Sequence, residues 1–217
     1  DSGIHVAPYL MASPQHIPTF ETVEAELGLP VFIKPANLGS SVGVFKINSA
    51  TEYKEKLKVA LSYDHKVLIE QQIVGKEVEC SVLGNEEPKA SLPGEIITNT
   101  EFYDFESKYV DSNASSTQIP ASITDEQIEI VRETAVKAYQ VMGCHGLARV
   151  DFFVTSAGEI LINEINTLPG FTNISMYPKM WEATGIGYAE LLDLLIELAL
   201  NKHEKDAALN VMAREVK

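Results

Sequence analysis

The chain has 217 residues, with 45% hydrophobic and 22% charged side chains, so it can bury a proper core as one domain or as two small lobes. Its formal net charge of −14 would repel a polyphosphate backbone on average, so we expect no nucleic-acid partner. No apolar run reaches membrane-spanning length, so we expect no membrane partner.

The first half of the chain predicts two helices, each followed by a pair of strands. The helices are recognised by apolar residues at helical spacing, and the strands by short β-branched runs between turn residues. In chain order these elements are a helix with Phe20, Val23 and Leu27 that ends at Gly28, strands at 31–36 and 42–47, a helix opened by a Ser49–Glu52 capping box with Tyr53, Leu57, Ala60 and Leu61, and strands at 66–73 and 76–84.

The second half predicts a long polar loop, a helix, a β-hairpin and a last amphipathic helix. In chain order these are a loop at 99–123, a helix opened by a Thr124–Gln127 capping box with Ile128, Val131, Ala135, Tyr139 and Met142 that stops at Gly143, two strands around a turn at 155–159, and a helix with Leu191, Leu194, Leu195 and Leu198, beyond which the residues from Asn201 are expected to fray. Long loops in compact domains are usually lids or binding loops. Helices and strands that mix without strict βαβ alternation favour an α+β fold.

The hairpin carries the most informative polar residues. If its turn centres on Ala157–Gly158, Asp151 faces Glu164 and Arg149 faces Asn166, all on one face of the sheet. Carboxylates that face each other repel, so the pair indicates a cation between them, and oxygen ligands favour Mg²⁺ or Mn²⁺. The alternatives are that the acids are simply solvated, as on most half-exposed hairpins, or that the register slips by one residue.

A glycine-containing loop, KPANLGSSVG, is a second candidate site. Gly39 and Gly43 flank two serines, which lets backbone N–H groups point at an anion, and Lys34 lies just upstream. The alternative is a plain turn, and Lys108 in the polar loop is by itself more often solvated. Together with a metal pair, these are the parts needed to hold a nucleoside triphosphate.

The two cysteines, Cys80 and Cys144, lie in apolar contexts. We expect both to be buried free thiols of a reducing compartment, and therefore a cytoplasmic protein.

Five motifs together resemble the ATP-grasp ligases, and within them the D-alanine–D-alanine ligases. They are LPVFIKPANLGSSVGV, KVLIEQQIVGKEVE, EFYDFESKY, GLARVDFF and INEINTLPGFTNISMYPKMW. The resemblance implies an ATP-grasp fold, with two α+β lobes whose mainly antiparallel sheets grip ATP. The lobes would be residues 1–70, the central lobe, and residues 71–217, the C-terminal lobe with the metal site and the mobile loop.

The resemblance also implies the roles of individual residues. ATP would be bound by Lys34, Glu70, Gln71, Ile73, Glu77 and Lys108. Two Mg²⁺ or Mn²⁺ ions would be bound by Asp151, Glu164 and Asn166. The catalytic group would contain Ser40, Lys108, Tyr109, Arg149 and the backbone N–H of Gly170, and the substrate would also contact Ser175 and Met176.

The implied reaction is the ATP-dependent joining of two D-alanines through an acyl phosphate, for peptidoglycan precursors, by a cytoplasmic homodimer. Relatives have an N-terminal lobe that supplies a glutamate for the first substrate's ammonium, and we expect the chain to lack it. Two alternatives stay open: a non-catalytic nucleotide-binding fragment, and an ATP-grasp ligase for another carboxylate and amine.

Overall fold

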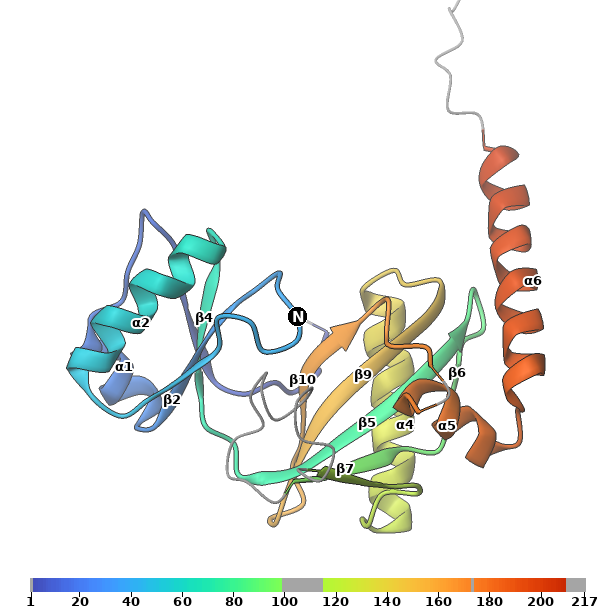
Figure 1. Cartoon of the computed structure of the whole chain (residues 1–217), viewed down its shortest axis with the longest axis horizontal. Coiled ribbons are helices and arrows are strands. Elements are labelled where there is room, and N and C mark those ends of the chain that lie inside the picture. Colours follow the sequence, from blue (N-terminus) through green and yellow to red (C-terminus); the bar gives the residue numbers. More distant parts are fainter. Residues whose placement is uncertain (1, 99–114, 173, 210–217) are drawn as a thin grey trace, which may run out of the picture. The chain divides into compact units, whose positions relative to one another are not determined.

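The computed structural model describes residues 2–98, 115–172 and 174–209, and the chain forms two compact units (Figure 1). Unit 1 comprises residues 1–4, 76–96 and 117–217, and unit 2 comprises residues 5–75 and 97–116. Within the described ranges, no helix is both long and apolar enough to cross a membrane.

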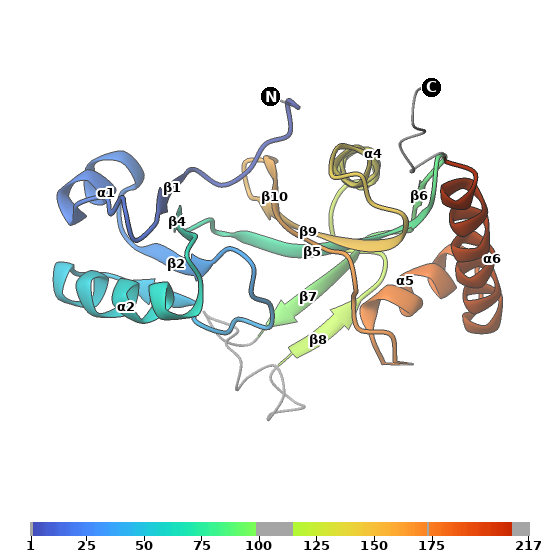
Figure 2. The same ribbon diagram turned by 90° about the horizontal axis from the view of Figure 1, so that it is seen from above.

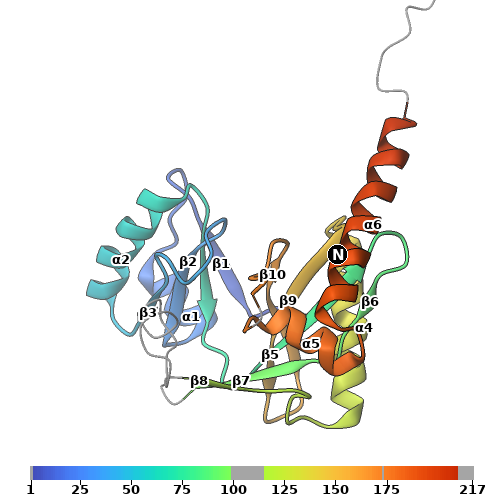
Figure 3. The ribbon, with the colours of Figure 1, turned by 45° about the vertical axis from the view of Figure 1, so that its right-hand side comes forward.

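Unit 2 is built on a four-stranded sheet with the strand order β1-β4-β2-β3. Its elements are β1 (Tyr9–Ala12), α1 (Phe20–Leu27), β2 (Val31–Pro35), β3 (Phe45–Ile47), α2 (Ala50–Tyr63) and β4 (Val67–Gln71). Helices α1 and α2 pack on one face of this sheet, where they bury alternate strand residues such as Val31, Ile33, Val67 and Ile69 (Figure 3). Lys34 and Glu70 alternate with those residues, so they lie on the opposite face.

The helix boundaries of unit 2 follow from local sequence. Gly28 ends α1 at a φ of +70°, a backbone conformation that glycine adopts at little cost. The predicted capping box of α2 is only half formed. Ser49 Oγ accepts from the N–H of Glu52 at 3.4 Å, whereas the Glu52 carboxylate accepts from the N–H of Asn48, one residue earlier than expected, at 2.7 Å.

Unit 1 is built on a six-stranded sheet with the order β10-β9-β5-β7-β8, and β6 pairs with β5. Its elements are β5 (Gly75–Gly84), β6 (Lys89–Ala90), β7 (Gly94–Thr98), β8 (Ser115–Gln118), α4 (Asp125–Val141), β9 (Gly146–Thr155), β10 (Ile160–Asn166), α5 (Met176–Thr184) and α6 (Tyr188–Ala207). Helix α4 covers one face of the sheet, and α5 lies on the other (Figure 2).

The core of unit 1 confirms most of the predicted helix stripes. The Thr124–Gln127 capping box is complete, and α4 buries Ile128, Val131, Ala135 and Tyr139 under the sheet. On the other face, α6 packs through Leu191, Leu194, Leu195 and Leu198 against Tyr177 and Trp181 of α5.

Three predictions for unit 1 were wrong at element boundaries. Met142 is 64% exposed instead of lining α4, because the helix ends at Val141 and Met142 is its C-cap. Residues 115–118 of the predicted loop form strand β8, which pairs with β7. Helix α6 continues past Asn201 to Ala207, and in these extra turns Lys202 pairs with Asp206 and Lys205 pairs with Glu86.

The cysteine prediction was half right. Both thiols are free, and Cys80 is buried in the core under α4, but Cys144 is only half-buried at the end of that helix.

Candidate functional site

The hairpin of β9 and β10 brings four of the predicted site residues together. Glu164 lies directly opposite Asp151, and Asn166 lies opposite Arg149, as the sequence predicted. The core-facing residues of β9, Val150 and Phe152, point to α4. Arg149 and Asp151 alternate with them and therefore lie on the other face.

A β-bulge at Asn163 produces this register. On the turn side Ile162 faces Phe152, whereas beyond the bulge Glu164 faces Asp151, so β10 contains one extra residue. With the same residues but no bulge, side-chain alternation would place Glu164 on the same face as Ile162, which packs against the core. The predicted turn centre was wrong by half a residue, because Thr155 pairs with Glu159 around Ala157. The bulge offsets that error.

Arg149 forms a bidentate ion pair with Asp151. Its Nε and Nη2 donate to Oδ1 and Oδ2 of Asp151, each at 2.7 Å. Burial opposes the charge of the guanidinium, but the hydrogen bonds and charge of Asp151, with smaller contributions from Glu79 and Glu164, raise the pKa of Arg149 above its ordinary value. Arg149 is thus a permanent cation next to the carboxylate pair.

The sequence reasoning missed Glu79. Its Oε2 lies 3.3 Å from Nε of Arg149, and only 7% of its side chain is exposed. Four carboxylates, those of Glu77, Glu79, Asp151 and Glu164, therefore share the sheet face of Arg149. Period-two alternation with Glu77 along β5 could have indicated the face, but not that β5 lies next to β9.

The donor set fits a divalent cation that is shared with a ligand. In residues 2–98, 115–172 and 174–209, no three His, Cys, Asp or Glu side chains form a cluster that could hold a metal by itself. Asp151 and Glu164 supply two carboxylates, and the amide oxygen of Asn166 accepts from the N–H of Leu168 at 3.1 Å with one lone pair left. Mg²⁺ is usually bound through one or two carboxylates plus water and substrate phosphates, so this set suits it.

The loop after β10 carries three more of the predicted residues. Ser175 is the N-cap of α5, but its side chain turns back into the loop, where Oγ accepts from the N–H of Thr172 at 3.0 Å instead of capping the helix. A side chain at Gly170 would lie 3.2 Å from that Oγ, so glycine allows the close approach. Met176 is the first residue of α5 and is buried.

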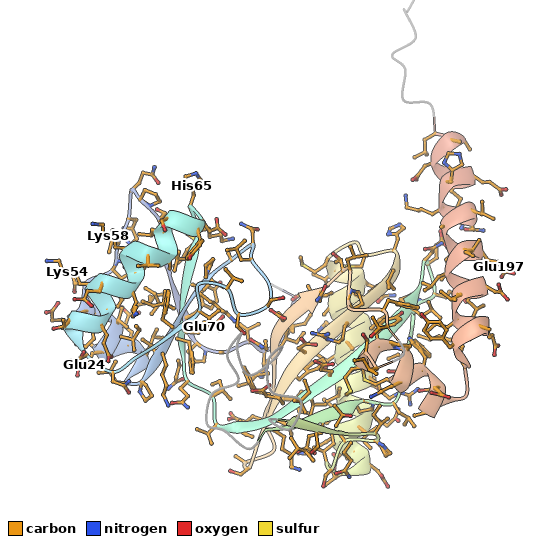
Figure 4. All side chains as sticks on the ribbon, viewed as in Figure 1. Glu24, Lys54, Lys58, His65, Glu70 and Glu197 are labelled. Carbon is orange, nitrogen blue, oxygen red and sulfur yellow. The ribbon has the colours of Figure 1, made fainter. Side chains whose placement is uncertain are left out.

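Unit 2 brings together two of the predicted nucleotide-binding residues. Nζ of Lys34 lies 2.6 Å from Oε2 of Glu70, in an ion pair on the face of the sheet opposite α2. Figure 4 labels Glu70 on β4 and shows Lys54 and Lys58 projecting outward from α2. The N–H of Gln71 already donates to the carbonyl of Pro8 at 2.9 Å, so an adenine at this strand end would need other groups of residues 70–73.

The glycine-containing loop after β2 is a tight, exposed turn. Ser40 and Ser41 both have positive φ angles, 56° and 57°, which is uncommon for residues other than glycine. Its first residues are anchored by Asp64, whose carboxylate accepts from the N–H and the side-chain amide of Asn37. The hydrogen bonds from the backbone N–H groups of Lys66 and Asn37 lower the pKa of Asp64.

Two predicted residues lie outside the described ranges, and one groove of the surface contains none of the predicted residues. Lys108 and Tyr109 fall in residues 99–114, which are not described. A groove of about 660 Å³ lies beside α2 and is lined by Phe20, Tyr53 and Leu57 among others, but by none of the predicted site residues.

Comparisons with known proteins show the family of the chain. Residues 1–197 match a family model described as the C-terminus of D-Ala–D-Ala ligases. The chain belongs to the D-alanine–D-alanine ligase family. It is 51% identical over 211 residues to D-alanine–D-alanine ligase A of Salmonella typhimurium. This match covers 96% of the chain but 58% of the Salmonella protein. The chain therefore spans little more than half the length of such relatives.

Solved structures give the same result. The ligase of Coxiella burnetii superposes with a TM-score of 0.82 at 40% identity, covering 94% of the chain and 55% of that protein. The ligase of Bacillus anthracis in complex with ATP gives 0.77 at 29% identity, covering 94% of the chain and 64% of that protein. The fold is the ATP-grasp fold of this family, as the sequence resemblance implied.

Proposed function

We propose that the chain is the nucleotide- and metal-binding part of an ATP-dependent D-alanine–D-alanine ligase that makes a peptidoglycan precursor. The observation that supports it most is the register of β9 and β10. It places two carboxylates opposite each other beside a clamped arginine, in a chain that belongs to this ligase family. Under this proposal the protein works in the cytoplasm as a homodimer, with D-alanine as its substrate.

In the proposed reaction, ATP phosphorylates the carboxylate of one D-alanine, and the amine of a second attacks the acyl phosphate with loss of phosphate. Two Mg²⁺ or Mn²⁺ ions at Asp151, Glu164 and Asn166 would neutralise phosphate charge. Arg149 and the N–H of Gly170 would stabilise the negative charge that develops on the acyl oxygen.

The remaining residues would bind and orient the two reactants. Lys34 would turn from Glu70 to the phosphates of ATP, whose several negative charges attract its ammonium group. Glu77 would hold the ribose hydroxyls, with adenine at Glu70, Gln71 and Ile73. Ser40 and Lys108 would close over the phosphates, Tyr109 would lie by the substrates, and Ser175 and Met176 would bind the second carboxylate.

A second candidate is a nucleotide-binding chain that does not ligate, and the 58% coverage of a relative favours testing it. Two proteins separate the candidates: the 217-residue chain, and a fusion that adds the unmatched part of the Salmonella typhimurium ligase. We expect both to bind ATP with Mg²⁺, the first about tenfold or more weakly, and only the fusion to release phosphate and form dipeptide.

The role of Arg149 is tested in the fusion. Arg149→Ala should lower kcat by roughly 10²–10³, as for loss of one oxyanion donor, with little effect on ATP binding. Lys202→Met removes an exposed lysine of α6 and should leave turnover unchanged. Dipeptide synthesis by the 217-residue chain alone would disprove the need for the added part, and absence of ATP binding in both proteins would disprove the proposed function.

A further inference from the structure

One donor group of Arg149 lies between two carboxylates from neighbouring strands. Nε carries a single N–H, which donates to Oδ1 of Asp151 at 2.7 Å, while Oε2 of Glu79 lies 3.3 Å from the same nitrogen. Nη2 also donates to Asp151, at 2.7 Å. In this state the guanidinium is held by Asp151 on β9, and Glu79 on β5 is the second acceptor within reach.

The proposed metal site makes a competing demand on Asp151. A divalent cation between Asp151 and Glu164 would use the same carboxylate oxygens that now accept from Arg149, and its charge would repel the guanidinium. Each oxygen of Asp151 keeps a second lone pair for the cation, but the positive charge of the metal weakens the hold of Asp151 on Arg149. A mostly buried arginine, 19% exposed, then needs another anion to hold its charged group in place.

We propose that Glu79 is a positioning residue that takes over the Nε–H of Arg149 when Asp151 turns to the metal ion. It thereby keeps the guanidinium on the sheet face where Arg149 serves as the oxyanion cation. This inference rests on the proposed function, because that function assigns Asp151 to the metal.

The surroundings of Glu79 suit this role. A charge-assisted hydrogen bond of about 2.8 Å requires Nε to approach Oε2 by only about half an ångström. Glu79 lies within β5, a ten-residue strand between β9 and β7, so its backbone is held on both sides. Among the described residues of unit 1, the ion pairs Lys76–Glu95 and Arg132–Glu129 involve residues of the α4 side of this sheet or of α4 itself.

The test observes the Nε–H of Arg149 directly. The chain has three arginines, so the Nε–H region of a ¹⁵N NMR spectrum contains three signals, and Arg149→Lys identifies that of Arg149. Mg²⁺ is titrated into the 217-residue chain with a non-hydrolysable ATP analogue. We compare the wild type with Glu79→Gln, which keeps the shape and removes the charge. The matched control is Glu129→Gln, which removes the carboxylate partner of Arg132 on α4.

In the wild type and in Glu129→Gln, the Arg149 signal should shift on Mg²⁺ addition and remain sharp, because the Nε–H of Arg149 then donates to Glu79. In Glu79→Gln the signal should broaden through exchange with water. The apparent Mg²⁺ affinity should fall at least about tenfold, because Arg149 then competes for Asp151. Glu79→Asp keeps the charge on a shorter side chain and should lie between the two, which also covers the case in which Glu79→Gln does not fold.

The possible failures are distinguishable. If Mg²⁺ shifts the Arg149 signal equally in the wild type, Glu79→Gln and Glu79→Asp, with equal affinity, Glu79 has no positioning role while the metal assignment stands. If Mg²⁺ with the analogue leaves the Arg149 signal of the wild type unchanged, Asp151 does not bind the metal, and both the proposed function and this inference are overturned.

Discussion

Replacing Arg149 with methionine should destabilise unit 1 by about 3 kcal/mol. Methionine fills most of the space but leaves the carboxylates of Asp151 and Glu79 without their cation, and their side chains are only 14% and 7% exposed. Removing one partner of a buried ion pair costs about 3–5 kcal/mol, and the residual exposure of Asp151 favours the lower end of that range. For a chain of this size, about 3 kcal/mol lowers the melting temperature by roughly 6–12 °C.

Trp181 provides the assay. It is the only tryptophan of the chain, it belongs to α5 in unit 1, and it is 2% exposed. Urea unfolding followed by its fluorescence therefore reports on the unit that contains Arg149. Mg²⁺ should restore part of the lost stability by binding the uncompensated carboxylates.

Lys202→Met is the matched control. It removes the same charge from an exposed pair with Asp206 on α6, and such pairs contribute little to stability. Adding Asp151→Asn to Arg149→Met should recover stability, because one orphaned charge disappears. If Arg149→Met and Lys202→Met unfold at the same urea concentration, the buried carboxylates do not depend on Arg149, and our electrostatic reading of the site is wrong.

Three further predictions follow from single features. Glu164→Gln in the ligase fusion should abolish Mg²⁺-dependent ATP turnover without changing the melting temperature of the protein, whereas unchanged turnover would contradict the metal assignment. Thr124→Ala should lower the free energy of unfolding by about 1 kcal/mol through loss of the α4 capping box, and an unchanged urea midpoint would count against it. Ellman's reagent should label one thiol of the native chain and no thiol of the Cys144→Ser variant, because burial raises the pKa of Cys80 to about 12. Fast labelling of the folded Cys144→Ser variant would argue against the burial of Cys80.

Local patterns in the sequence were enough to predict most helices and the hairpin. The stripe of α6 and the capping box of α4 appear in the structure, because they depend on contacts within one element or with whatever lies beneath it. The facing of Asp151 and Glu164 was also predicted. The predicted turn centre was half a residue off. A β-bulge that no residue pattern had indicated placed Glu164 opposite Asp151 nevertheless.

Tertiary structure decided what surrounds those residues. Glu79 reaches Arg149 because β5, some seventy residues earlier in the chain, lies beside β9, and strand order is set by the packing of the whole unit. Likewise, Met142 is exposed because the chain turns away at Gly143, although its spacing fits the buried side of α4. Sequence periodicity determines which face of an element is apolar. Contacts between distant segments decide which neighbours pack on that face and which carboxylates lie next to a buried arginine. No local pattern contains those contacts.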